Sequence, residues 1–143
     1  MKHLIKLKLC KKVSDFTVDI ITPISMESLD NVTYLRIPSL DGLTGIQARH
    51  ASSIIALDIG EIKIVTNNKE KFFATSGGFA DIRPEGTQLL LETFESENMI
   101  DKKRAHQAVE KATKHISSKN DDLKRATLAL KRAKNRLAIL KKL

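Results

Sequence analysis

With 143 residues, 41% of them hydrophobic and 29% charged, and a net charge of +8, the chain can form one medium-sized domain or a small domain with an appendage. No apolar run approaches the ~20 residues that span a bilayer, and the first ten residues lack the uninterrupted apolar region of a signal peptide. The single cysteine, Cys10, excludes an internal disulfide and favours a cytoplasmic location, and the four histidines show no metal-ligand spacing.

The first regular pattern lies at residues 2–9, where apolar and basic side chains alternate. Ile5, Leu7 and Leu9 fall on one side, and the lysines between them fall on the other. This pattern predicts a strand or, if nothing covers it, a basic arm.

From residue 16 to residue 93, short runs rich in β-branched and aromatic residues alternate with turn signals. The predicted strands are residues 16–21, 32–37, 54–57, 61–66, 71–75, 79–82 and 87–93. Asn67-Asn68 predicts a hairpin turn. Gly77-Gly78 predicts a bend or a close approach between chain segments, because neither glycine has a Cβ atom. Short strands at this spacing predict a β-sandwich or a barrel.

The character of the sequence changes at residues 100–105. Beyond them there is neither Gly nor Pro, and apolar residues recur at helical spacing. Residues 101–143 contain 14 Lys and Arg against 4 Asp and Glu, whereas residues 1–100 contain 11 against 13. Asp101 is well suited to be the N-cap of the first helix. We therefore predict a β-sandwich domain at residues 1–98 and a basic helical hairpin at residues 99–143.

Both predicted helices have narrow apolar faces. The first carries the small stripe Ala105, Ala108, Val109, Ala112 and Ile116. The second carries the heptad seam Leu123, Ala126, Leu130, Ala133, Leu137 and Leu140. A polar link at residues 117–121 predicts an antiparallel hairpin. Because Ala-rich faces bury little area, at ~25 cal/mol per Å², the hairpin has modest predicted stability and could exchange one docking place for another.

Seven short pieces, in order, resemble the epsilon subunit of the bacterial rotary ATP synthase. They are Phe16 to Thr22-Pro23, Ile37-Pro38 with Asp41-Gly42 and Gly45-Ile46, His50-Ala51, Leu57 with Gly60, Ser76-Gly77-Gly78-Phe79, Ile100-Asp101 with Arg104-Ala105, and Arg125 to Leu137. The resemblance implies an α+β fold, with an N-terminal antiparallel β-sandwich of about ten strands and a C-terminal antiparallel two-helix hairpin. The chain departs from the family at Ala48-Arg49, where Pro-Gly is usual, and residues 1–14 extend beyond the usual start.

The resemblance also implies a function. Such a subunit is non-catalytic, turns with the central stalk, couples ion translocation to ATP synthesis and restrains ATP hydrolysis through its hairpin. The implied partners are the gamma subunit and the membrane c-ring, and the catalytic alpha/beta head when the hairpin is extended. Membrane association is then indirect, at the cytoplasmic face of the bacterial inner membrane. No cofactor is required, and ATP is the implied regulatory ligand.

Some family members bind ATP through the pattern Ile or Leu, Asp, two variable residues, Arg and Ala, which is complete in this chain. The candidate ATP-binding residues are Glu95, Ile100, Asp101, Arg104, Ala105, Arg132 and Arg136. Guanidinium groups bind phosphate oxygens through paired hydrogen bonds, and a helix N-terminus offers free N–H groups to an anion. The two carboxylates could accept hydrogen bonds from the adenine amino group or the ribose.

Simpler interpretations stay open. Asp101 can be a plain N-cap, and the three arginines can form an ordinary solvated face. His50 is expected to be a packing or turn residue, since no nucleophile pattern accompanies it, and Gly77-Gly78 lacks the pattern of a phosphate-binding P-loop.

Two other functions were weighed against the rotor subunit. A nucleic-acid-binding protein could use the basic helices, but the chain has no Trp and no aromatic residue beyond Phe94 to stack on bases. A free-standing enzyme would need a triad, a carboxylate pair or a metal cluster, and the sequence shows none of these patterns.

Overall fold

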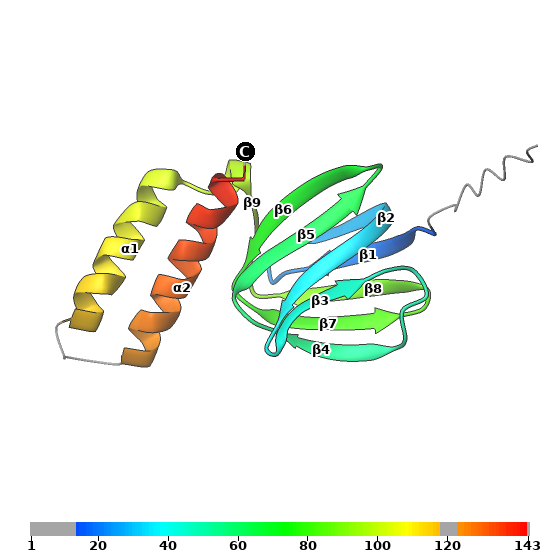
Figure 1. The fold of residues 1–143 in the computed structure, drawn as a ribbon, viewed down its shortest axis with the longest axis horizontal. Coiled ribbons are helices and arrows are strands. Elements are labelled where there is room, and N and C mark those ends of the chain that lie inside the picture. Colours follow the sequence, from blue (N-terminus) through cyan, green and yellow to red (C-terminus); the bar gives the residue numbers. More distant parts are fainter. Residues whose placement is uncertain (1–13, 118–122, 143) are drawn as a thin grey trace, which may run out of the picture.

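The computed structural model describes residues 14–117 and 123–142, so the predicted strand at residues 2–9 and Cys10 lie outside the described residues. The described part is a β-sandwich followed by two packed helices (Figure 1), which confirms the predicted α+β class. The nine strands are β1 (Phe16–Ile21), β2 (Met26–Ser39), β3 (Gly42–Ile46), β4 (Ser53–Leu57), β5 (Gly60–Thr66), β6 (Lys69–Thr75), β7 (Gly78–Arg83), β8 (Gly86–Leu91) and β9 (Phe94–Ser96). A 3-10 turn, η1 (Glu97–Met99), leads to the helices α1 (Lys102–Ser117) and α2 (Leu123–Leu140).

The strands follow the order β1-β8-β7-β4-β2-β5-β6-β9, with β3 paired to β2. All pairings are antiparallel except that between β1 and β8. The long strand β2 turns at Asn31, which has a φ of 58°. Its first half pairs with β1 and its second half pairs with β3 and β5. This strand therefore connects the layer that contains β5 and β6 to the layer that contains β7 and β8 (Figure 1).

Three strand segments were not predicted from the sequence: the first half of β2, the strand β3 and the strand β9. Residues 26–31 are mostly exposed, so no apolar alternation marks them. β3 contains two glycines in five residues, and β9 has only three residues. These segments are extended because each pairs with a neighbouring strand that is itself strongly patterned.

The core lies between the two layers and is built from the inward side of each strand. In β5, Ile62 and Ile64 are buried and alternate with outward Lys63, as the sequence pattern predicts. Leu35 and Ile37 of β2 meet them from the neighbouring strand and are 0% exposed. The sandwich thus has a conventional apolar core of its own.

The predicted turns have clear conformational causes. Asn67 and Asn68 have φ angles of 50° and 60°, which confirms the hairpin turn between β5 and β6. At Gly78 a Cβ atom would lie 2.0 Å from the carbonyl oxygen of Leu90, so this glycine permits a close approach between strands. Arg49 has a φ of 62°, a conformation that glycine adopts more readily, at the position where the chain departs from its family.

The helices form an antiparallel hairpin beside the sandwich, with α2 facing the sheet (Figure 1). Ala105 and Ala112 of α1 and Ala133 of α2 are buried, which lets the helix axes approach closely. Ile139 of α2 is buried against the sandwich, together with Ile100. The hairpin therefore has a small-residue seam between its helices and one apolar contact with the sheet.

Candidate functional site

The N-terminus of α1 begins with the motif Ile100-Asp101-Lys102-Lys103-Arg104-Ala105. The Oδ1 atom of Asp101 accepts a hydrogen bond from the backbone N–H of Arg104 at 2.9 Å, so Asp101 is the N-cap of this helix. Ile100 is 8% exposed and packs in the apolar contact with α2. Ala105, 5% exposed, faces the helix seam. Three of the four motif residues thus have a structural task, and Asp101 keeps its second carboxylate oxygen for other partners.

A cavity of about 340 Å³ lies between this helix start, the end of β9 and α2. Its lining comprises Glu95, Met99, Ile100, Asp101, Arg104, Ala105, Ala108 and Arg136. Six of the seven predicted site residues therefore line one cavity, although 41 positions separate Glu95 from Arg136. The tertiary structure brings the motif, the carboxylate of β9 and one arginine of α2 together.

Arg132, the seventh predicted residue, lines a neighbouring crevice instead. The crevice has no room for a water molecule, and Ala74, Thr75, Ser76, Thr93, Glu95, Arg132, Asn135 and Arg136 line it. The hydroxyl groups of Thr93 and Ser76 lie 2.9 Å apart there and bond to each other. Glu95 and Arg136 line both hollows, so their side chains form the boundary between them.

Glu95 and Arg136 form a bidentate ion pair. Nε of Arg136 lies 2.6 Å from Oε2 of Glu95, and Nη2 lies 2.7 Å from Oε1. The hydrogen bonds from Arg136 to the Glu95 carboxylate raise the pKa of the guanidinium, against partial burial, which lowers it. The sequence pointed to both residues but not to this pairing, which engages both oxygens of the expected nucleotide-contacting carboxylate.

Further polar contacts hold α2 to the corner between β4 and β5. The ammonium group of Lys131 pairs with the carboxylate of Asp58, and Nδ2 of Asn135 donates to the carbonyl oxygen of Gly60 at 2.7 Å. The hydrogen bond from Lys131 lowers the pKa of Asp58, desolvation opposes this effect, and the N–H of Ile59 adds to it. Sequence reasoning did not find these residues, and the only available signal was the four-residue spacing of Lys131 and Asn135 on one helix face.

The C-terminal end of the hairpin has a similar contact. Nζ of Lys142 lies 2.6 Å from Oε2 of Glu61 and 4.4 Å from the centre of the Phe72 ring. Glu61 also accepts a hydrogen bond from Nη2 of Arg36 at 2.6 Å. Basic residues of α2 and of the chain just after it therefore face acidic residues of the sandwich at three places in the contact.

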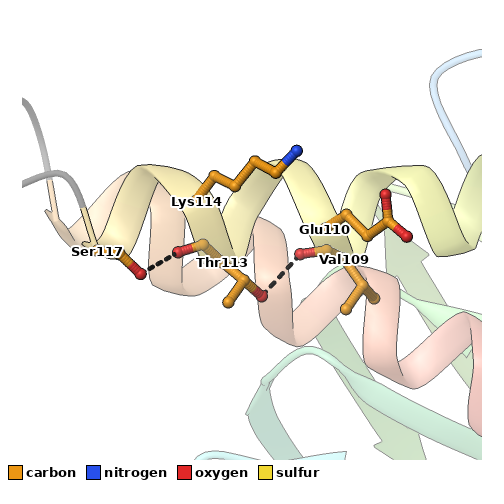
Figure 2. A pocket seen from close by; sticks show the side chains of 5 residues that line it. All are labelled: Val109, Glu110, Thr113, Lys114 and Ser117. Atoms are coloured by element: carbon orange, nitrogen blue, oxygen red, sulfur yellow. Dashed lines mark hydrogen bonds between the residues drawn. The ribbon is translucent and has the colours of Figure 1, made fainter.

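A larger hollow of about 480 Å³ runs along α1, away from these residues (Figure 2). The hydroxyl of Thr113 donates to the carbonyl oxygen of Val109 at 2.8 Å, and that of Ser117 donates to the carbonyl oxygen of Thr113 at 3.0 Å. Both hydroxyls are thus engaged with their own helix, and none of the predicted site residues lines this hollow. The smaller cavity at the start of α1 is the better candidate site.

The described residues show no catalytic constellation and no metal centre. Nowhere in residues 14–117 and 123–142 do three His, Cys, Asp or Glu side chains gather closely enough to hold a metal ion. In the same ranges, no helix has the length and apolar character needed to cross a membrane. What the candidate site offers is binding: cationic guanidinium groups, a helix N-terminus and an apolar wall.

Two family descriptions match almost the entire described chain. Residues 15–97 match the description ATP synthase, Delta/Epsilon chain, beta-sandwich domain, and residues 99–141 match ATP synthase, Delta/Epsilon chain, long alpha-helix domain. The ATP synthase epsilon chain of Bacillus pumilus is 34% identical over 123 residues, which are 85% of this chain and 94% of the relative. That of Staphylococcus haemolyticus is 33% identical over 129 residues, covering 89% and 97%.

Solved structures show the same fold at lower sequence identity. A chain of the Euglena gracilis mitochondrial ATP synthase has a TM-score of 0.77 at 19% identity, over 88% of this chain and 81% of that chain. A chain of the Tetrahymena thermophila mitochondrial ATP synthase has a TM-score of 0.54 at 17% identity, over 90% and 96%. The sandwich with its appended helices is therefore a shared architecture.

Proposed function

The chain belongs to the family of ATP synthase delta/epsilon chains, which are non-catalytic subunits of that enzyme, and we propose that it acts in the central stalk of an F-type ATP synthase. In this role its helical hairpin responds to ATP. In this proposal the sandwich contacts the gamma subunit and the c-ring. The complex holds the chain at the cytoplasmic face of the bacterial inner membrane.

The observation that carries the ATP proposal is the shared cavity at the start of α1. It places the arginines Arg104 and Arg136 on two different helices around one hollow, with the capped helix N-terminus at its wall. An anion bound there would contact both helices and β9 at once. Binding to the docked form alone would stabilise that form by ~1.4 kcal/mol for each tenfold excess of ATP over its dissociation constant.

The contact between hairpin and sandwich supports a reversible response. Apart from the small apolar cluster around Ile139, it consists of ion pairs and hydrogen bonds that water can replace. When released, the basic side chains would be free to meet acidic surface on the catalytic alpha/beta head and oppose rotation in the hydrolysis direction. When docked, Lys131, Arg136 and Lys142 have acidic partners on the sandwich, which weakens the case for a nucleic-acid-binding surface.

The first experiment is an ATP titration of the purified chain followed by amide NMR. Saturable shifts at Glu95, Asp101 and Arg104 are expected, and they should vanish in the double variant Arg132→Ala/Arg136→Ala. Substituting Lys124 and Lys134, which are both exposed on the same helix, by Ala provides the matched loss of two positive charges. Absence of shifts at millimolar ATP would reduce these residues to capping and surface charge.

The inhibitory role needs the assembled enzyme. Deleting residues 101–143 should leave assembly intact, because the sandwich has its own core, and should raise the rate of ATP hydrolysis. An unchanged rate in a fully assembled complex would reject the inhibitory role and leave the stalk assignment in place.

A further inference from the structure

The Glu95–Arg136 ion pair occupies the boundary between the two hollows of the candidate site. The 2.6 and 2.7 Å hydrogen bonds engage both carboxylate oxygens of Glu95. The carboxylate expected to accept hydrogen bonds from a nucleotide already accepts one at each oxygen, and the guanidinium expected to bind phosphate already has a counter-ion.

This arrangement opposes the binding of an anion at Arg136. The guanidinium keeps N–H groups that the carboxylate does not use, but a phosphate approaching them would come close to the negative charge of Glu95. Like charges in a partly buried site repel more strongly than in bulk water. A phosphate must therefore displace the carboxylate or bind against its repulsion.

Arg132 differs from Arg136 in this respect. It is half-buried beside the same carboxylate, yet it forms no ion pair within the described ranges 14–117 and 123–142. The two arginines lie one helical turn apart. The charge of Arg136 is thus balanced by Glu95, whereas that of Arg132 is not balanced by an ion pair in the part of the chain that the structure describes. A phosphate that drew Arg136 away from Glu95 would gain the second charge and join the two hollows.

We propose that Glu95 acts as a gate for phosphate. Without ligand, its carboxylate takes the place of an anionic ligand on Arg136, and a nucleotide has to displace it. This inference rests on the proposed ATP site and deepens it. Glu95 then selects for ligand charge and does not recognise the base or the ribose. Without ligand the ion pair also connects β9 to α2, so it contributes to docking of the hairpin.

The test compares Glu95→Gln with the matched control Glu97→Gln in the full chain, each titrated with ATP and with adenosine. Glutamine keeps the shape of Glu95 and removes its charge. Glu97 lies two residues away and forms no ion pair among the residues that the structure describes. The measured quantity is the ratio of the adenosine and ATP dissociation constants. A change in hairpin docking affects both constants and cancels in this ratio, because both ligands bind the docked form.

In Glu95→Gln the preference for ATP over adenosine is expected to rise about tenfold, which corresponds to ~1.4 kcal/mol. In Glu97→Gln it should stay close to that of the unaltered chain. A lower preference for ATP over adenosine in Glu95→Gln would overturn the proposed gate. It would show that the carboxylate binds the base or the ribose, and the ATP site itself would stand. An unchanged preference, or an equal rise in Glu97→Gln, would overturn it as well. Failure of ATP to bind the unaltered chain and both variants would instead reject the ATP site itself.

Discussion

The sandwich and the docked hairpin are held by different forces. Fifteen buried apolar residues form the core of the sandwich. In the described residues, the apolar cluster between hairpin and sandwich has three buried members, Ala74, Ile100 and Ile139, with Phe72 and Leu140 partly buried against them. The remainder of that contact consists of three ion pairs and the hydrogen bond from Asn135. The first region is stabilised by removing a large apolar area from water, whereas the second combines a small apolar cluster with ion pairs that solvent screens.

This difference separates folding from docking. Burial of apolar side chains contributes about 1.5–3 kcal/mol for each large residue, while a partly exposed ion pair contributes about 0.2–1 kcal/mol. The sandwich is therefore expected to stay folded under conditions that release the hairpin. The proposed change in position of the hairpin depends on this hierarchy of stability.

The largest loss of stability is expected from a substitution in the core of the sandwich. Leu35→Ala, at a side chain that is 0% exposed, should lower the free energy of unfolding by about 3 kcal/mol, because it removes buried apolar area and leaves a cavity. Urea unfolding followed by circular dichroism measures this loss. The control Leu40→Ala, at a side chain that is 67% exposed, should change it by less than about 0.5 kcal/mol. Equal losses in both variants would contradict the assignment of the core.

A smaller loss, in the docking of the hairpin and not in the stability of the sandwich, is expected from a substitution in the apolar contact of α2. Ile139→Ala should cost about 2 kcal/mol of docking free energy and leave the unfolding midpoint of the sandwich unchanged, because Ile139 belongs to the second cluster only. Amide exchange along α2 reports docking, and exchange along β5 reports the sandwich. Leu123→Ala, at the exposed start of α2, is the matched control. Loss of β5 protection in step with α2 would show that the two regions form one cooperative unit.

The smallest effect is expected at the ion pair between Lys131 and Asp58. Asp58→Asn should weaken docking by about 0.5 kcal/mol, since solvent screens a pair of which each side chain is at least one-third exposed. The folded pKa of Asp58 is lowered, so its contribution is complete above the unfolded value of ~3.9 and disappears as pH falls through the folded value.

The measurement is the exchange rate of α2 amides between neutral pH and the acid limit, with the rates corrected for the intrinsic effect of pH. Asp81→Asn, which removes an ion pair with Arg83 on the sandwich, should leave α2 docking unaltered. A pH dependence that persists unchanged in Asp58→Asn would show that the pair between Lys131 and Asp58 is not its source.

Local sequence was enough to predict most of the architecture. The alternation of Ile62 and Ile64 marks β5, Asn67-Asn68 marks its turn, and Asp101 marks the start of α1, because each feature depends on neighbours within a few positions. The residues of the candidate site were also found from the sequence, through a family resemblance to the motif at Ile100. Weakly patterned strands such as β3 could not be found this way, since only their partners make them extended.

The contacts between distant residues came from packing. Nothing near Glu95 in the chain indicates that its carboxylate meets Arg136, and nothing near Lys131 indicates that it meets Asp58. These pairs form because Ile100 and Ile139 pack α2 against the sandwich at one place and in one orientation. Periodicity predicts which face of a strand or helix is buried. Which charged groups then lie opposite one another depends on how the folded elements meet, and in our proposal this pairing determines how a phosphate binds at the site.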